Sequence, residues 1–298
     1  MELSNQPNKV LFMGLGASGK SSIRSIVFEG KSIADVKDYN ATINYTRSTK
    51  SIIDAPFQIF DCGGQESFIS VFVGEQAEFI FSDVVVLIWV IDISNFDTVS
   101  TSKFYFDLAL KKLAMYSERA AVFCLLHKMD LLLPDMKNQV VETVKMYFKP
   151  NFGIDIQYRP TSIFDHSIYI VIGEIIQTLM IKSSKGQTVS EAIEEFLKSN
   201  IEMSGIAIYT DEGLPVFEGG ETDRIILPAN LLLASYERLA SEYSQDEIKT
   251  VLETNNYIFV FRVIKSHLFL SGIAKKVAPL QYVLVKMEQL TESLNQLL

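Results

Sequence analysis

Short apolar runs alternate with segments of helical spacing through the first half of the chain. The apolar runs predict strands at 10–13, 57–60, 84–91, 120–126 and near Tyr158. The helical spacing predicts helices at 20–28, 103–116, 138–148 and 166–181. The run 84–91 is apolar at every position, which is typical of a strand covered on both faces. We therefore expect an α/β domain with a mostly parallel sheet and helices on both of its faces.

The pattern changes after the polar and glycine residues from Lys182 to Gln187. A helix opened by a capping box at Thr188 is followed by a hairpin, a helix at 229–243, three strands and a last helix after Pro279. This order predicts an α+β domain with an antiparallel five-stranded sheet. The expected organisation is a first domain at 1–183, a linker at 184–187 and a second domain at 188–298.

A glycine-rich segment directly after the first predicted strand matches the phosphate-loop pattern G-x4-G-K-[ST]. Its glycines allow a tight loop, so that successive N–H groups can surround a phosphate at a helix N-terminus. Lys20 would reach the β- and γ-phosphates, and the Ser21 hydroxyl would bind Mg²⁺. The alternative is a glycine-rich turn that binds nothing. The expected phosphate-binding residues are Gly14, Gly16, Ala17, Ser18, Gly19, Lys20, Ser21 and Ser22.

A second motif, Asp61-Cys62-Gly63-Gly64-Gln65, ends the strand predicted at 57–60. Asp61 is placed to hold Mg²⁺. Gly64 would let a backbone N–H bind the γ-phosphate and move when that phosphate leaves. Gln65 stands where a glutamine can orient the attacking water.

Between these motifs, Thr42 is the candidate whose hydroxyl would join Mg²⁺ while its N–H meets the γ-phosphate. Thr46 and Thr49 are nearby alternatives. Arg24 and Arg47 are candidates for a built-in arginine finger, but we interpret both as solvated charges.

A third motif, His127-Lys128-Met129-Asp130, follows the strand predicted at 120–126. Asp130 could accept hydrogen bonds from N1–H and the exocyclic amine of guanine, while the stem of Lys128 covers the base. Adenine lacks these two donors, so a carboxylate here favours guanine. Ser162 and Ile163 lie at the next strand end, where a loop can brace the base. His127 departs from the common N-K-x-D form.

Composition and charge restrict the class of protein. The formal charge of −9 argues against sequence-independent nucleic-acid binding. The two cysteines, Cys62 and Cys124, are expected to be reduced thiols, and their number and spacing do not match a zinc-binding motif. The N-terminus lacks a signal-peptide pattern, and 84–91 is too short to span a bilayer. We expect a cytoplasmic protein without direct membrane insertion, recruited to a membrane surface, if at all, through partners.

Together the motifs at 61–65, 127–130 and 161–169 resemble the Rag/Gtr family of GTPases, in which His at the first position of the base motif is typical. The resemblance implies a Ras-like P-loop GTPase domain at 1–183 and a roadblock-like dimerisation domain at 188–298. It implies GTP/GDP and Mg²⁺ as ligands. The motifs at 61–65 and 127–130 are nearer the A/B-type subunit, and 165–169 is nearer the C/D-type partner. We therefore consider an undiverged relative able to homodimerise.

The leading hypothesis is a slow GTP hydrolase that works as a nutrient-type signalling switch, with catalytic roles for Gln65, Lys20 and Thr42. The implied partners are a second copy or a related GTPase bound through 188–298, activating and exchange factors, and roadblock-type scaffold proteins. One alternative is a non-hydrolysing, GTP-bound scaffold that recruits partners through its C-terminal domain. Another is a P-loop ATPase or kinase, in which Asp130 is a structural carboxylate.

Overall fold

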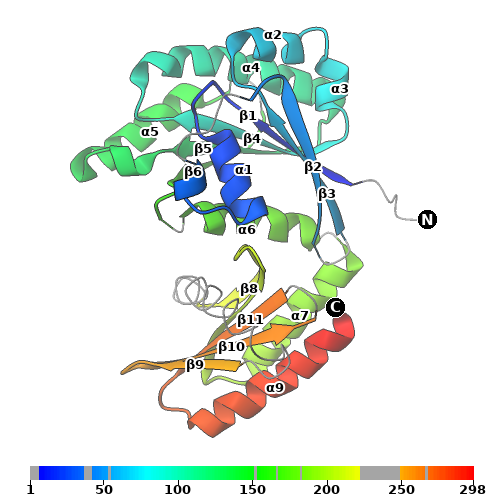
Figure 1. Cartoon of the computed structure of the whole chain (residues 1–298), viewed down its shortest axis with the longest axis vertical. Coiled ribbons are helices and arrows are strands. Elements are labelled where there is room, and N and C mark those ends of the chain that lie inside the picture. Colours follow the sequence, from blue (N-terminus) through cyan, green and yellow to red (C-terminus); the bar gives the residue numbers. More distant parts are fainter. Residues whose placement is uncertain are drawn as a thin grey trace. The chain divides into compact units, whose positions relative to one another are not determined.

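The computed structural model describes residues 7–36, 42–52, 55–150, 153–165, 167–181, 183–221, 249–265 and 268–298. The chain divides into two compact units, Met1–Ile168 and Tyr169–Leu298 (Figure 1). This division falls inside helix α6 (Ser167–Met180), ahead of the domain boundary expected near residue 183. The domain limits at 1–183 and 188–298 stay predictions. In the described part of the chain, every helix is too short or too polar to cross a bilayer.

The first unit contains a six-stranded sheet in the order β2-β3-β1-β4-β5-β6. β2 pairs antiparallel with β3, and all other neighbours are parallel. The predicted mostly parallel sheet is therefore confirmed. Its strands are β1 (Asn8–Met13), β2 (Tyr45–Ile52), β3 (Ala55–Cys62), β4 (Val84–Asp92), β5 (Ala121–His127) and β6 (Ile156–Thr161).

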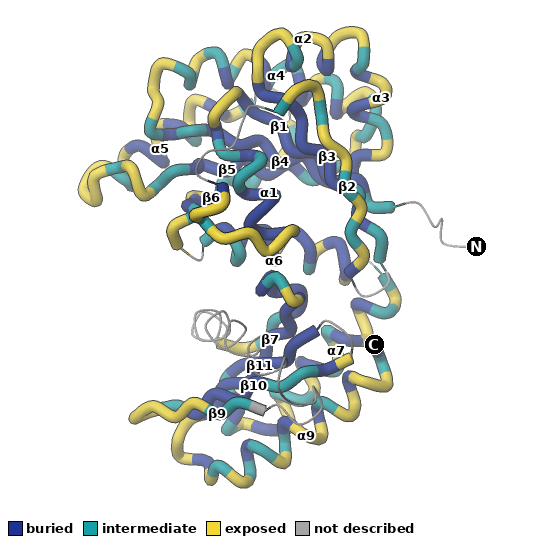
Figure 2. Tube along the Cα trace, in the orientation of Figure 1, coloured by how far each residue is buried: buried dark blue, intermediate teal, exposed yellow. Residues whose placement is uncertain are grey.

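Helices cover both faces of this sheet. On one face, Leu11 and Met13 of β1 pack in a core together with residues of α2, α3, α4 and α5. Phe12 points to the opposite face, where the centre of its ring lies 6.3 Å from that of Phe28 in α1. The indole N–H of the buried Trp89 in β4 donates to Ser102 of α4 at 3.1 Å. The central strands β1 and β4 are mostly buried along their length (Figure 2). The helices are α1 (Lys20–Glu29), α2 (Glu66–Val73), α3 (Ala77–Phe81), α4 (Val99–Tyr116) and α5 (Lys137–Phe148), with short 3-10 turns at η1 (Ala34–Val36), η2 (Phe96–Thr98), η3 (Met129–Leu131) and η4 (Pro134–Met136).

The second unit contains a five-stranded sheet in the order β8-β7-β11-β10-β9, and all of its neighbouring strands are antiparallel. This confirms the predicted antiparallel sheet. A Cβ at Gly272 would lie 2.4 Å from the sulfur of Met287, so the missing side chain lets α9 approach the sheet. The helix predicted at 229–243 lies outside the described residues. The elements are α7 (Ser184–Ser199), β7 (Met203–Thr210), β8 (Pro215–Gly220), β9 (Lys249–Glu253), β10 (Tyr257–Ile264), β11 (Leu268–Lys275) and α9 (Leu280–Leu297).

Helix α7 begins four residues before the capping box that the sequence suggested. The Ser183 side chain accepts a hydrogen bond from the Gly186 N–H at 3.0 Å and so caps the first turn. Residues 184–187, which the sequence suggested as a linker, therefore form the first turn of α7. The hydroxyl of Thr188 instead donates to the Ser184 carbonyl at 2.9 Å, inside the helix.

This cap yields a stability prediction. Ser183→Ala removes an acceptor from the first turn and is expected to lower the free energy of unfolding by about 1 kcal/mol. Thr188→Ala is the matched control and is expected to change it by less than about 0.5 kcal/mol. Urea denaturation of the full chain measures both, and a larger loss for Thr188→Ala would contradict the assigned cap.

Candidate functional site

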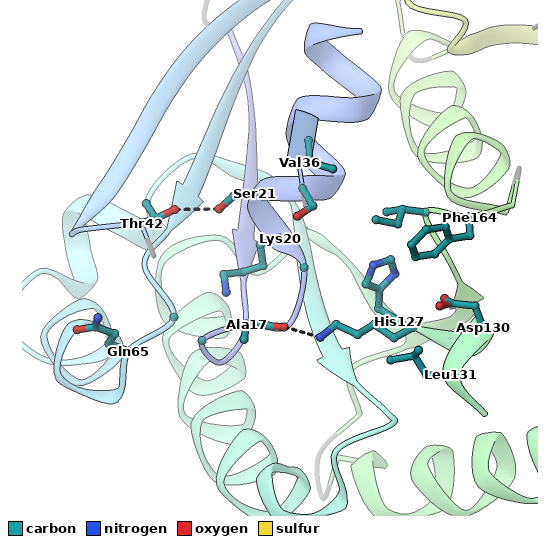
Figure 3. Close-up of a pocket in the computed structure, with 16 residues that line it drawn as sticks. Ala17, Lys20, Ser21, Val36, Thr42, Gln65, His127, Asp130, Leu131 and Phe164 are labelled. Carbon is teal, nitrogen blue, oxygen red and sulfur yellow. Dashed lines mark hydrogen bonds between the residues drawn. The ribbon is translucent and has the colours of Figure 1, made fainter. Parts of the chain in front are cut away.

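A cavity of about 440 Å³ lies at the carboxyl ends of β1, β3, β5 and β6 (Figure 3). Parallel α/β sheets bind ligands at this edge. Of the residues predicted for the site, Gly14, Ser18, Asp61 and Ser162 are not part of the lining. The lining also includes Val36, Leu131 and Phe164, which sequence reasoning missed. It consists of Gly16, Ala17, Gly19, Lys20, Ser21, Ser22, Val36, Thr42, Gly64, Gln65, His127, Lys128, Asp130, Leu131, Ile163 and Phe164.

The predicted phosphate loop joins β1 to α1 in a conformation that needs glycine. Gly14 has φ 139° and Gly19 has φ 101°, and Ala17 also adopts the left-handed region at φ 58°. A Cβ at Gly14 would lie 2.2 Å from the carbonyl oxygen of Val90 in β4. Gly19 is the N-cap of α1 and gives its first turn no side-chain acceptor. The N–H groups at this helix start are therefore suited to an anion in the cavity.

Lys20 is held by the loop that precedes it. Its ammonium group donates to the Leu15 carbonyl at 2.8 Å and to the Ser18 hydroxyl at 3.4 Å. Burial lowers the pKa of Lys20 to about 8, while the nearby Asp61 carboxylate acts in the opposite direction. A phosphate in the cavity would supply this cation with stronger acceptors than a carbonyl and a hydroxyl.

The predicted metal ligands come together from three segments. The hydroxyls of Ser21 and Thr42 lie 2.8 Å apart (Figure 3). The alternatives Thr46 and Thr49 are exposed on β2. The Asp61 side chain is 1% exposed, and neither of its oxygens has a hydrogen-bond partner among the described residues.

Burial raises the pKa of Asp61, and Ser21, Lys20 and Arg24 oppose that rise, in that order. A buried carboxylate with free lone pairs near two hydroxyls fits Mg²⁺, which prefers oxygen ligands. The described residues contain no cluster of three or more His, Cys, Asp or Glu side chains able to hold a metal. Nucleotide phosphates and water would therefore complete the coordination.

Gly64 and Gln65 follow Asp61 in the sequence, and Gly64 lies against the phosphate loop. A Cβ at Gly64 would lie 2.5 Å from the backbone nitrogen of Gly16, so these two segments touch through their backbones. Gln65 is the N-cap of α2, is exposed and lines the cavity. Its side chain is therefore available to a water molecule beside a bound phosphate.

His127 links β5 to β6 and to the phosphate loop. The residue is 2% exposed, and its Nδ1 lies 2.9 Å from the Thr161 hydroxyl. A Cβ at Gly19 would lie 2.6 Å from Cδ2 of the His127 ring, so the imidazole packs directly against the loop. Burial lowers the pKa of His127 to about 4, with the Lys128 charge acting in the same direction. The ring is therefore neutral at physiological pH.

Lys128 lines the cavity, and its backbone adopts the left-handed conformation with φ 66°. Its ammonium group donates to the Ala17 carbonyl at 2.8 Å and pairs with Asp92 at 2.6 Å. The Lys128 charge and hydrogen bonds from Lys128 and Ser94 hold the pKa of Asp92 below its usual range despite its partial burial. Sequence reasoning missed Asp92, although its place directly after the apolar run 84–91 could have marked it.

Asp130 and the residues around it form the opposite end of the cavity. The carboxylate of Asp130 accepts a hydrogen bond from the Ser162 hydroxyl, which in turn accepts one from the Phe164 N–H at 3.0 Å. Leu131 is 63% exposed and Phe164 is 58% exposed. Exposed apolar surfaces on either side of a carboxylate suit a flat, aromatic ring that carries hydrogen-bond donors.

Of the two arginines that the sequence indicated to be solvated charges, Arg24 differs from that interpretation. The Arg24 side chain is 15% exposed and forms ion pairs with Glu29 and Asp61, so its interpretation as a solvated charge is wrong. Arg47 is exposed, and its guanidinium lies 5.7 Å from the centre of the Phe60 ring. Neither arginine lines the cavity.

Comparison with known proteins identifies close relatives of the chain. A family model described as the Gtr1/RagA G protein conserved region matches residues 9–214. GTP-binding protein GTR1 of Saccharomyces cerevisiae is 33% identical over 201 residues, which cover 66% of this chain and 64% of GTR1. GTP-binding protein gtr1 of Schizosaccharomyces pombe is 28% identical over 250 residues, 81% of each chain. GTP-binding protein GTR2 of S. cerevisiae is 27% identical over 194 residues, 60% of this chain and 53% of GTR2. The chain thus covers 64% of the length of GTR1 and 53% of the length of GTR2, less than two thirds of each S. cerevisiae protein.

The buried imidazole predicts a pH dependence of stability. The pKa of His127 is about 4 in the folded protein against an ordinary value of 6.5, so between these values the unfolded chain binds a proton that the folded chain does not. The free energy of unfolding should therefore fall as pH falls through this window. His127→Asn, which has no proton to bind there, should show a shallower fall. Urea denaturation at about pH 7 and about pH 5 measures this difference; equal losses in the two proteins would contradict it.

Proposed function

Because the chain belongs to the Gtr1/RagA family of G proteins, we propose that it is a molecular switch that binds GTP or GDP with Mg²⁺ and hydrolyses GTP slowly. The observation that carries this proposal is the position of Asp130. Its carboxylate lines the same cavity as the phosphate loop, and Lys128 binds the Ala17 carbonyl of that loop. A nucleotide with its base at Asp130 and its phosphates at Lys20 would span this cavity.

The base would be recognised by charge and by shape. Asp130 would accept hydrogen bonds from N1–H and the exocyclic amine of guanine, and Ser162 keeps the carboxylate oriented. Asp130 is exposed in the free protein, and a bound adenine would cover the carboxylate without offering it these donors, which is costly. Lys128 and Phe164 would cover the faces of the base.

The phosphates would lie along the loop and the start of α1. Lys20 would exchange the Leu15 carbonyl for β- and γ-phosphate oxygens, and Mg²⁺ would be held by Ser21, Thr42 and Asp61. When bound, the metal neutralises charge on the phosphates. Gln65 would orient the water that attacks the γ-phosphate, and Lys20 would stabilise charge that develops on the transferred group.

The same contacts explain how the site would switch. Thr42 and Gly64 come from segments on either side of β2 and β3, and both line the cavity. Each would hold the γ-phosphate through its backbone N–H, so hydrolysis would release both segments. None of the lining residues is an arginine. We therefore expect an intrinsic rate on the order of 10⁻⁴–10⁻³ s⁻¹ and a further arginine supplied by an activating partner.

We infer that the switch works as one half of a pair. The chain is similar both to GTR1 and to GTR2, so a related GTPase or a second copy of this chain is the expected partner, bound through 188–298. Activating and exchange factors and roadblock-type scaffold proteins would complete its partners. Recruitment to a membrane surface would go through them, and the signal relayed would be of the nutrient type.

Guanine recognition is tested at Asp130. GTP is expected to displace a fluorescent GDP analogue from the wild-type chain at a concentration at least about 100-fold lower than ATP. Asp130→Asn should lose this preference and gain affinity for xanthosine triphosphate, because the amide can donate to the 2-carbonyl of xanthine. Equal competition by GTP and ATP in the wild type would overturn the guanine assignment.

Hydrolysis is tested at Gln65. Gln65→Leu is expected to lower the single-turnover rate of GTP hydrolysis at least about tenfold while leaving GTP affinity within about twofold of the wild type. Phosphate release measures the effect, with Gln139→Leu as the control, because Gln139 is an exposed glutamine of α5 outside the cavity lining. An unchanged rate would remove Gln65 from the mechanism. A wild-type chain that binds GTP but never releases phosphate would favour the non-hydrolysing scaffold.

A further inference from the structure

Arg24 lies next to the proposed metal site, on the same helix as Ser21 but outside the cavity lining. Its Nε is 3.4 Å from an Asp61 oxygen, and the two side chains are 15% and 1% exposed. That Nε has no hydrogen-bond acceptor, and the Asp61 oxygens have no donor, among the described residues. The two groups therefore form a largely buried ion pair.

A second carboxylate competes for the same guanidinium. Nη1 of Arg24 forms an ion pair with Glu29 at the end of α1, and Nη2 donates to Ser25 at 3.3 Å. Glu29 is 29% exposed and also pairs with Lys31 at 3.1 Å. The arginine is thus shared between a buried carboxylate in the site and a more exposed one outside it.

We propose that Arg24 is the counter-ion of Asp61 in the metal-free protein, and that it thereby sets the Mg²⁺ concentration needed to retain nucleotide. This inference rests on the proposed nucleotide and Mg²⁺ site. A buried carboxylate without a countercharge is costly, so the arginine stabilises the site when the metal is absent. The same positive charge repels Mg²⁺ and competes for Asp61, so it weakens metal binding. Arg24 is therefore a positioning residue that eases release of metal and nucleotide.

The test measures dissociation of a fluorescent GDP analogue from the full chain as free Mg²⁺ is varied. Arg24→Met keeps the length of the side chain without its charge and is expected to lower the Mg²⁺ midpoint about threefold or more. Arg24→Lys keeps the charge and should stay within about twofold of the wild type. Glu29→Gln removes the charge that competes with Asp61 for the guanidinium. The Mg²⁺ midpoint of this variant should therefore rise above that of the wild type.

A midpoint that is unchanged or raised in Arg24→Met would overturn the inference. If that variant does not fold, a midpoint that fails to rise in Glu29→Gln overturns it instead. Thermal unfolding with GDP gives a second readout, in which removal of Mg²⁺ by a chelator should destabilise Arg24→Met more than the wild type. A wild-type chain that retains the GDP analogue equally with and without Mg²⁺ would show that the proposed metal site itself has failed.

Discussion

Backbone contacts that only glycine allows hold the phosphate loop in place. Side chains at three positions would collide with a neighbour: Gly14 with the Val90 carbonyl, Gly19 with the His127 ring and Gly64 with the Gly16 backbone, at 2.2, 2.6 and 2.5 Å. These contacts bring the loop against β4, against the base motif and against the segment after β3. Because all three converge on one loop, the phosphate, base and metal ends of the cavity depend on the same packing.

The second constraint is that several charged side chains lie close together in a largely buried part of the site. Asp61, Lys20 and Arg24 carry charges at a site that is largely hidden from water, and burial acts on the pKa values of Asp61 and Lys20 in the direction that disfavours each charged form. Mutual attraction opposes this effect, so the groups stabilise one another. A nucleotide with Mg²⁺ would rearrange these pairs, since phosphate would take Lys20 and the metal would take Asp61. The site thus has one charge balance with ligand and another without it, which is what a switch requires.

Much of the fold could be predicted because its signals are local. The uninterrupted apolar run at 84–91 lies in β4. The order of predicted strands and helices indicated a mostly parallel sheet followed by an antiparallel one, and the structure contains both. Most of the motif residues between Gly16 and Ser22, all except Ser18, line one cavity together with Thr42, Gln65 and Asp130. Contacts between distant residues could not be predicted from local pattern. Asp92 pairs with Lys128 across neighbouring strands. Arg24 is half-buried and pairs with Asp61 of β3, although its helix position looked exposed. The start of α7 was missed because a Thr-x-x-Glu pattern was a stronger signal than the single serine that caps the helix.

The central claim is that this cavity holds a guanine nucleotide in a protein that works as a pair. Native mass spectrometry of the purified full chain tests both parts in one preparation. The account predicts a particle of twice the 33.6 kDa chain mass, with one GDP or GTP released from each chain on denaturation. A particle of one chain mass at a protein concentration of tens of micromolar would contradict pairing with a second copy of this chain. An adenine nucleotide in place of GDP or GTP would contradict the guanine site.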